Sequence, residues 1–448
     1  MAIASSRGAC TFVGWCPPMK LRSVDIQNFR AIASLRLPLD PYLTVLHGRN
    51  ANGKTSVLAA IAVGLGIIPT LLAGGGGKSF SKLTDVRNNE NTTTVELETS
   101  DGLRWSRAAT RVGGFMAQHA AKATSTQPLR DLLKKLADDL AAEQETTLPV
   151  FAFYDTDRAV FDLPERKRAF RNEFTRLDAY SGALEAKPSF KSLIEWFYAL
   201  ENNELREQRR LEDTSFRLPA LEAVRSAIIR MLPDVTNPHI EPPVRFVVQR
   251  STGPGNLETL SLDQLSGGYR IVLAMAADLA RRMALGNPHL TDPLSSEAIV
   301  LIDEIELHLH PEWQQRIIGD LRRTFPNAQF IVSTHSPQVL TTVQPQHIVR
   351  LRSGQNGVEA LATTGPTFGA ESGDVLSAEM GVDERPINEL STKLERYLAL
   401  IDRDEGEGQD ALALRVELVA LSPNEPALAA ADVAIERRKL LRSLANQQ

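Results

Sequence analysis

Short apolar runs alternate with longer helical patterns through most of the chain. The runs at residues 42–47, 149–154, 298–302 and 329–332 are almost wholly apolar, which is typical of strands buried on both faces. A helical pattern at 311–324 separates the last two runs. Strand–helix–strand units of this kind predict an α/β fold in which helices cover both faces of a parallel sheet.

Other segments have a single apolar face. Leu35, Leu37 and Leu39 alternate with polar or small residues and predict a half-buried strand. Strands are also predicted at 93–99 and 102–112, a helix at 128–145, and a flexible loop at the glycine run 74–77. A further helix is predicted to begin near Gly268, because five apolar residues come after it at helical spacing: Val272, Met275, Ala276, Leu279 and Met283.

Residues from about 160 to 232 have a different character. They are rich in charge, as in the sequence ENNELREQRRLE at 201–212, and predict a helical insertion that stands out from the sheet. Such charge runs usually indicate a solvated helix face. The tail from about 383 is predicted to be helical, with an acidic turn at 402–410.

Composition mainly excludes classes of protein. The chain has 448 residues, of which 43% are hydrophobic and 23% charged, as in ordinary globular proteins. A net charge of −5 excludes a general basic coat for nucleic acid but not a local basic face. The two cysteines, Cys10 and Cys16, exclude a disulfide framework and a cysteine-based zinc site. A membrane span needs about 18–20 uncharged apolar residues in a row. We expect no stretch of that length, and therefore no membrane span.

The first 18 residues differ in character from the rest of the chain. They lack the long apolar core of a secretory signal, and a strand pattern begins only at Met19. We therefore expect residues 1–18 to be an extension outside the folded core.

The first candidate site is the sequence GRNANGKT at residues 48–55, which we call the glycine loop. It matches the pattern G-x-x-x-x-G-K-[ST] and lies between a predicted strand and a predicted helix. In such loops backbone N–H groups and the helix N-terminus bind phosphate. Lys54 would reach the β and γ phosphates, and Thr55 would ligate Mg²⁺. The candidate ATP-binding residues are Gly48, Arg49, Asn50, Ala51, Asn52, Gly53, Lys54, Thr55 and Ser56.

The second candidate is the sequence IVLIDE at 299–304, an apolar strand that ends in two carboxylates. Asp303 is the candidate to hold Mg²⁺ opposite the glycine loop. Glu304 would then orient or deprotonate the attacking water.

Two further motifs are ambiguous on their own. Ser266, Gly267 and Gly268 begin a predicted helix and could form an anion site, or Ser266 could be an ordinary N-cap. His335 comes after a predicted strand and could reach a γ-phosphate or have a structural role. His308 and His310 are predicted to be loop residues rather than metal ligands, because residues two apart do not share a helix face.

In this order, the glycine loop, a long insertion, LSGG, IVLIDE and a histidine after the next strand resemble the ATP-binding-cassette ATPases of the SMC/RecF/OLD-like branch. The resemblance covers about residues 19–351. LSGGYR and IDEIELHLHPEWQ are similar to the stand-alone AAA-type ATPases of bacterial defence cassettes, such as Septu PtuA-like and retron-associated proteins.

The resemblance implies a P-loop NTPase fold, with an ABC-ATPase head that has a mixed, mainly parallel sheet. It also implies five parts: an extension at 1–18, a first ATPase lobe at 19–158, a helical insertion at 159–243, a second lobe at 244–365 and a helical C-terminal extension at 366–448.

The resemblance also assigns roles to the ambiguous residues. Ser266, Gly267 and Gly268 match the signature that touches ATP bound to a second subunit, and His335 matches the switch histidine. Two ATP molecules would be held in a head-to-tail homodimer, or in a larger assembly of such dimers. The family's glutamine loop is missing, which leaves Asp155 or Asp157 as candidates for its contact with Mg²⁺-bound water.

We therefore expect a cytoplasmic ATPase that converts ATP and water to ADP and phosphate and regulates a DNA-directed nuclease or other effector in anti-phage defence. The alternative is a RecF-like repair ATPase that acts on DNA without a nuclease. Five basic residues at 166–176, together with Arg104, Arg107 and Arg111, could then touch phosphates. A membrane-transporter subunit is disfavoured by the charged insertion and the missing glutamine loop.

Overall fold

The computed structural model describes residues 19–81, 84–112, 115–119, 126–156, 171, 173–185, 190–242, 244–253, 255–354, 357–383 and 385–445. Residues 1–18, Asp157 and residues 166–170 lie outside the described residues. The chain forms two compact units, of which the first ends at Val375 and the second begins at Leu376. The five predicted parts and their boundaries stay predictions.

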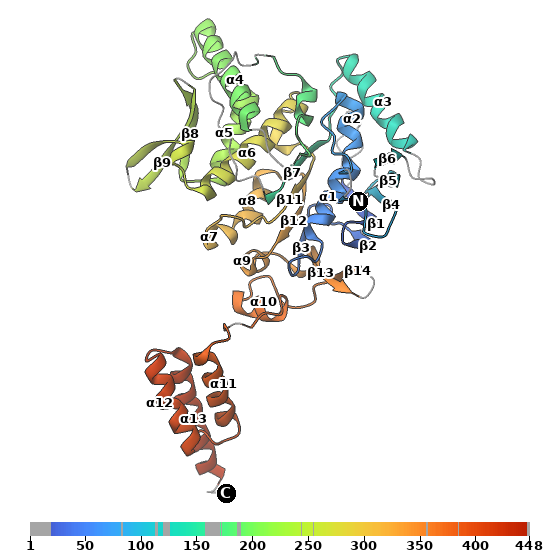
Figure 1. The fold of residues 1–448 in the computed structure, drawn as a ribbon. Helices are drawn as coiled ribbons and strands as arrows, with labels where there is room; N and C mark the ends of the chain where they lie inside the picture. The colour runs from blue at the N-terminus through green and yellow to red at the C-terminus, as the bar shows by residue number, and fades with distance from the viewer. Residues whose placement is uncertain are drawn as a thin grey trace, which may run out of the picture. The chain divides into compact units, whose positions relative to one another are not determined.

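A six-stranded sheet, in the order β14-β13-β3-β12-β11-β7, is the centre of the first unit (Figure 1). Its strands are β3 (Leu43–His47), β7 (Val150–Tyr154), β11 (Ala298–Ile302), β12 (Ala328–Thr334), β13 (Ile348–Gly354) and β14 (Gly357–Ala362). All neighbours are parallel except β14, which is antiparallel to β13. Every residue of β3, β7, β11 and β12 is buried, so the four apolar runs are confirmed as buried strands.

A second sheet is antiparallel, in the order β2-β1-β4-β5-β6. It comprises β1 (Leu21–Phe29), β2 (Ile32–Pro38), β4 (Thr92–Thr99), β5 (Arg104–Val112) and β6 (Phe115–His119). Leu35 and Leu37 point into the core, as their alternation predicts. The helix α3 (Gln127–Ala141) packs beside β5 and α2.

Helix α1 (Lys54–Leu65) contacts strands of both sheets and leads into α2 (Ile67–Ala73). The indole of Trp105 in β5 donates a 2.9 Å hydrogen bond to the carbonyl of Gly64. The stretch Lys54–Ala73 is long and apolar enough to cross a membrane, so the expectation that no such stretch exists was wrong. Because most of this stretch is buried inside the protein, it has the character of a core helix.

The glycine run at 74–77 is only partly a free loop. A Cβ at Gly77 would lie 1.9 Å from the carbonyl oxygen of Gly66, whereas Gly74 and Gly75 face open space. A Cβ at Gly66 would in turn lie 2.0 Å from the carbonyl oxygen of Lys78. The second half of the run therefore crosses the junction of α1 and α2 at a distance that only glycine permits.

Helix α6 (Gly267–Gly286) is buried almost all round, although its sequence predicts one apolar face. The reason is α5 (Pro219–Met231), which packs along α6 and also touches α8 (Ile317–Thr324). The predicted insertion therefore does not simply stand out from the sheet, since α5 is part of the core. Helix α4 (Phe190–Leu211) lies above α5 and α6 in Figure 1.

A small antiparallel sheet, β10-β9-β8, comes after α5. Its strands are β8 (Val235–Glu241), β9 (Arg245–Gly253) and β10 (Asn256–Ser261), and β10 leads towards α6. Beyond β11, the short helices α7 (Pro311–Gln314) and α9 (Pro337–Leu340) flank the ends of the central strands.

After α10 (Ser372–Ala378), the described residues of the second unit form three helices, which confirms the predicted helical tail. They are α11 (Glu389–Asp402), α12 (Gln409–Leu421) and α13 (Pro426–Ala445). Their separate core includes Leu394, Tyr397, Ile401, Leu418 and Leu428.

Candidate functional site

The glycine loop connects the carboxyl end of β3 to the amino end of α1. Its backbone has positive φ at Gly48 (148°), Ala51 (66°) and Gly53 (85°). A Cβ at Gly48 would lie 2.2 Å from the carbonyl oxygen of Leu351, so only glycine fits there. Helix α1 begins without a side-chain cap, which leaves its first N–H groups available to an anion.

Lys54 is folded over this loop. Its ammonium group donates hydrogen bonds of 2.8 Å to the Gly48 carbonyl and 3.1 Å to the Arg49 carbonyl. Burial lowers the pKa of Lys54, although the nearby carboxylates of Asp303 and Glu304 oppose this shift. Lys54 is only 6% exposed, so its ammonium group is enclosed by the loop.

Asp303 joins the end of β11 to the start of α1. One carboxylate oxygen accepts a 2.7 Å hydrogen bond from the Thr55 hydroxyl, and the other accepts one from the Ser333 hydroxyl. The Ser333 hydroxyl also accepts a 2.8 Å bond from the Glu304 amide. Glu304 has a left-handed backbone with φ of 46°, so the chain turns sharply directly after Asp303.

His335 lies at the end of β12, between the ends of β3 and β11. Its backbone amide donates a 2.5 Å hydrogen bond to Glu306, and the Thr334 hydroxyl donates a 2.8 Å bond to the same carboxylate. Sequence reasoning missed Glu306 and Ser333, although a third carboxylate soon after IVLIDE is a visible signal.

Asp155 comes directly after β7, whose register pairs Tyr154 with Ile302. That register places Asp155 beside Asp303 at the same edge of the sheet. One carboxylate oxygen of Asp155 accepts a 2.7 Å hydrogen bond from the amide of Thr156. The other candidate for this position, Asp157, lies outside the described residues.

Ser266 is the N-cap residue of α6, but its side chain makes no capping hydrogen bond. Its side chain is exposed, whereas Gly268 is buried against the turn after β11. A Cβ at Gly268 would lie 2.9 Å from the carbonyl oxygen of His308, so this contact requires glycine. Next to it, the ring of Tyr269 packs edge-on against Trp313 with centroids 4.4 Å apart.

His308 and His310 lie outside regular helix, as predicted, and His310 caps α7 by accepting a 3.4 Å bond from the Glu312 amide. Among the described residues, no group of three or more histidine, cysteine or carboxylate side chains is arranged to hold a metal ion.

The basic residues proposed to touch DNA are largely committed to other contacts. Arg107 is half-buried and donates to the Val63 and Lys78 carbonyls at 2.5 and 2.7 Å, and desolvation lowers its pKa to about 10. Arg104 pairs with Glu98 at 2.9 Å, and Arg111 donates to the Val86 carbonyl at 3.3 Å. In the described part of the basic stretch, Arg171 pairs with Asp178 at 2.7 Å and Arg176 donates to the Gly286 carbonyl at 2.8 Å.

A buried ionic network fixes the middle of α6. Asp278 pairs with Arg281 and Arg282 at 2.7 Å each, and it accepts a 3.1 Å hydrogen bond from the Tyr154 hydroxyl. Burial opposes ionisation of Asp278, but the two arginines outweigh it and hold its pKa at about 2. Arg282 also donates a 2.8 Å bond to the carbonyl of Ala179. The network therefore ties α6 to the end of β7.

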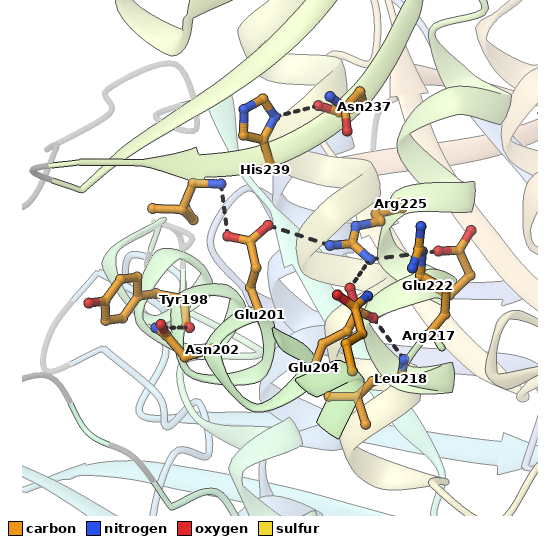
Figure 2. Close-up of polar contacts among 12 residues, drawn as sticks. Tyr198, Glu201, Asn202, Glu204, Arg217, Leu218, Glu222, Arg225, Asn237 and His239 are labelled. Atoms are coloured by element: carbon orange, nitrogen blue, oxygen red, sulfur yellow. Dashed lines mark hydrogen bonds and ion pairs between the residues drawn. The ribbon is translucent and has the colours of Figure 1, made fainter. Parts of the chain in front are cut away.

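A second network, centred on Arg225 of α5, holds the insertion in place (Figure 2). Its guanidinium contacts Glu204 at 2.7 Å and Glu201 at 3.4 Å, both on α4. Glu201 also accepts a 3.0 Å bond from the Ile240 amide in β8, and burial raises the pKa of this carboxyl. Glu204 accepts a 2.8 Å bond from the Leu218 amide at the start of α5. One cluster thus joins α4, α5 and β8.

Two family models of AAA domains match the chain. The family model described as "AAA domain, putative AbiEii toxin, Type IV TA system" matches residues 43–341, more than half of the chain, and an "AAA ATPase domain" model matches residues 19–66. The Retron Ec83 probable ATPase of Escherichia coli is 28% identical over 94% of this chain and 87% of its own length.

Two further matches are more limited. The Septu protein PtuA of Bacillus mycoides is 43% identical over 17% of this chain and 10% of its own length. A solved SMC head bound to the C-winged helix domain of ScpA is similar at a TM-score of 0.46 and 13% identity, over 77% of this chain and 98% of that chain. The predicted resemblance to AAA-type ATPases is confirmed: the chain belongs to the AAA-domain family whose model matches residues 43–341.

Proposed function

We propose that the chain binds ATP and Mg²⁺ at the glycine loop and hydrolyses ATP to ADP and phosphate. The observation that carries this proposal is the 2.7 Å bond between Thr55 and Asp303, which brings a hydroxyl and a carboxylate together beside Lys54. These hard oxygen donors fit Mg²⁺, which prefers carboxylates, waters and substrate phosphates. When bound, Mg²⁺ would neutralise charge on the phosphates.

The phosphate groups would lie on the backbone amides of residues 48–56, and Lys54 would exchange its loop carbonyls for phosphate oxygens. Glu304 would accept a proton from water while the water oxygen bonds to the γ-phosphorus and the bond to ADP breaks. His335 would contact the γ-phosphate from the end of β12.

The proposed unit is a head-to-tail homodimer, or a larger assembly of such dimers, in which each Ser266 meets the ATP of the other subunit. Two features support this arrangement: Ser266 is exposed without capping its own helix, and Gly268 packs against the turn that comes after Glu304. A closed dimer would therefore sense ATP through Ser266, Gly267 and Gly268.

We propose that this cycle regulates a separate DNA-directed nuclease or other effector in anti-phage defence, in the cytoplasm. The similarity to a retron ATPase and to Septu PtuA supports the defence setting. The RecF-like alternative loses support because Arg107 is half-buried on two carbonyls and the other described arginines of that hypothesis already have partners. Arg166, Lys167 and Arg168 lie outside the described residues and stay candidates for direct DNA binding.

The experiment is to measure ATP turnover and oligomeric state with and without duplex DNA and with the product of the neighbouring gene. We expect Mg²⁺-dependent turnover, ATP-driven dimers, and a stable complex with the neighbouring gene product. Turnover that needs only DNA, with no complex, would favour the repair alternative. Absence of both turnover and nucleotide binding would refute the proposed activity.

A further inference from the structure

We propose that Glu306 is a positioning residue that fixes the backbone of His335, and thereby aims its side chain at the γ-phosphate. This inference rests on the proposed function, because it concerns the same site. It assigns a task to a carboxylate that neither the glycine loop nor the pair Asp303 and Glu304 accounts for.

The two oxygens of the Glu306 carboxylate accept from different groups on the β12 end. Oε1 accepts the backbone amide of His335 at 2.5 Å, and Oε2 accepts the hydroxyl of Thr334 at 2.8 Å. The Thr334 hydroxyl oxygen in turn accepts a 3.0 Å bond from the amide of Ser336. The carboxylate thus holds Thr334 and His335 directly, and Ser336 through the Thr334 hydroxyl.

Other bonds join the same two segments. The amide of Ile305 donates a 3.0 Å bond to the Ser333 carbonyl, and the Glu304 amide donates a 2.8 Å bond to the Ser333 hydroxyl. Residues 304–306 and 333–336 are therefore joined by several hydrogen bonds across the ends of β11 and β12. Among residues 304–306, Glu306 is the one that reaches His335 itself.

This arrangement suits positioning better than proton abstraction. Both Glu306 oxygens already accept hydrogen bonds from charge-neutral donors, which favours a fixed carboxylate. A displacement of about 1 Å at a reacting group can lower the rate about 100-fold. Loss of a residue that holds the His335 backbone can therefore lower the rate of ATP hydrolysis strongly.

The test compares Glu306→Ala with Glu306→Gln, which keeps an acceptor for the His335 amide and a partner for Thr334. We expect Glu306→Ala to lower kcat at least about tenfold with ATP affinity within about threefold of wild type, and Glu306→Gln to retain most of the turnover. Combined with His335→Ala, Glu306→Ala should cause little further loss, because both changes remove the same contact.

Amide hydrogen exchange at His335 provides a readout that does not depend on turnover. We expect exchange to speed up at least about tenfold in Glu306→Ala and to stay near wild type in Glu306→Gln. Wild-type turnover in Glu306→Ala, equal losses in the two variants, additive losses with His335→Ala, or unchanged exchange would each overturn the inference. If the wild-type protein hydrolyses no ATP, the proposed function fails, and exchange alone then decides whether Glu306 fixes His335.

Discussion

The Thr55 hydroxyl donates a 2.7 Å hydrogen bond to Asp303 across 248 residues of sequence. This bond joins the first turn of α1 to the end of β11. It brings the two candidate Mg²⁺ ligands together. The candidate site is therefore organised by parallel strands that end at one edge of the central sheet.

We expect Lys54→Ala to abolish ATP binding, with a loss of affinity of at least about 100-fold, because it removes the ammonium group that is folded over the glycine loop. Equilibrium binding of a fluorescent ATP analogue measures this loss. Lys135→Ala changes an exposed lysine on α3 and is the matched control. Unchanged affinity in Lys54→Ala would rule out the glycine loop as the ATP site.

We expect Ser266→Arg to block ATP-driven dimerisation and to leave ATP binding by the monomer within about threefold of wild type, because a bulky cation would occupy the closed interface. Analytical ultracentrifugation with ATP, in the slow-hydrolysing Glu304→Gln background, gives the oligomeric state. Lys135→Ala again serves as control. Normal dimers in the Ser266→Arg protein would show that this helix start does not meet ATP in a second subunit.

His47 provides a pH prediction. Both ring nitrogens are buried without a hydrogen-bond partner, and burial, together with Arg350 and Lys54, lowers the pKa of His47 to about 4. Between this value and the usual histidine pKa of 6.5, the unfolded state binds the proton more readily than the folded state. The free energy of unfolding is therefore highest above about pH 6.5 and falls as the pH is lowered towards 4.

The measurement is urea unfolding of wild type and His47→Leu at several pH values. From pH 7 to pH 5, wild type should lose about 2 kcal/mol more stability than the variant. His308→Gln, at an exposed turn, should behave like wild type. Parallel curves for wild type and His47→Leu would contradict the assignment.

Asp278→Asn should destabilise the protein by about 3–5 kcal/mol, because it leaves Arg281 and Arg282 buried without their counter-ion. Urea unfolding at neutral pH measures the change, and Asp138→Asn on the exposed face of α3 is the control. A change below about 1 kcal/mol would mean that water or other groups replace the pair.

The sequence predicts the central strands well because β3, β7, β11 and β12 are buried on both faces and therefore read as continuous apolar runs. It predicts only one of the buried faces of α6, because Asp278, Arg281 and Arg282 look exposed until their partners are known. Those partners include Tyr154 and the Ala179 carbonyl, more than 100 residues away.

Similar limits apply to the candidate site. The motifs single out Lys54, Thr55 and Asp303 as candidates, since each has a characteristic neighbour in sequence, and the structure brings Thr55 and Asp303 into contact. Arg107 looks like a surface cation in sequence, but it is half-buried and donates to the carbonyls of Val63 and Lys78. Local patterns contain no information about such long-range partners.

The most direct test of the proposed ATPase cycle is to measure ATP hydrolysis and ATP-dependent dimerisation of Glu304→Gln beside wild type. Because glutamine is nearly isosteric but a poor proton acceptor, we expect normal ATP affinity, turnover lowered at least about 100-fold, and accumulation of ATP-bound dimers. Wild-type turnover in Glu304→Gln, or ATP-bound protein that stays monomeric, would contradict this cycle.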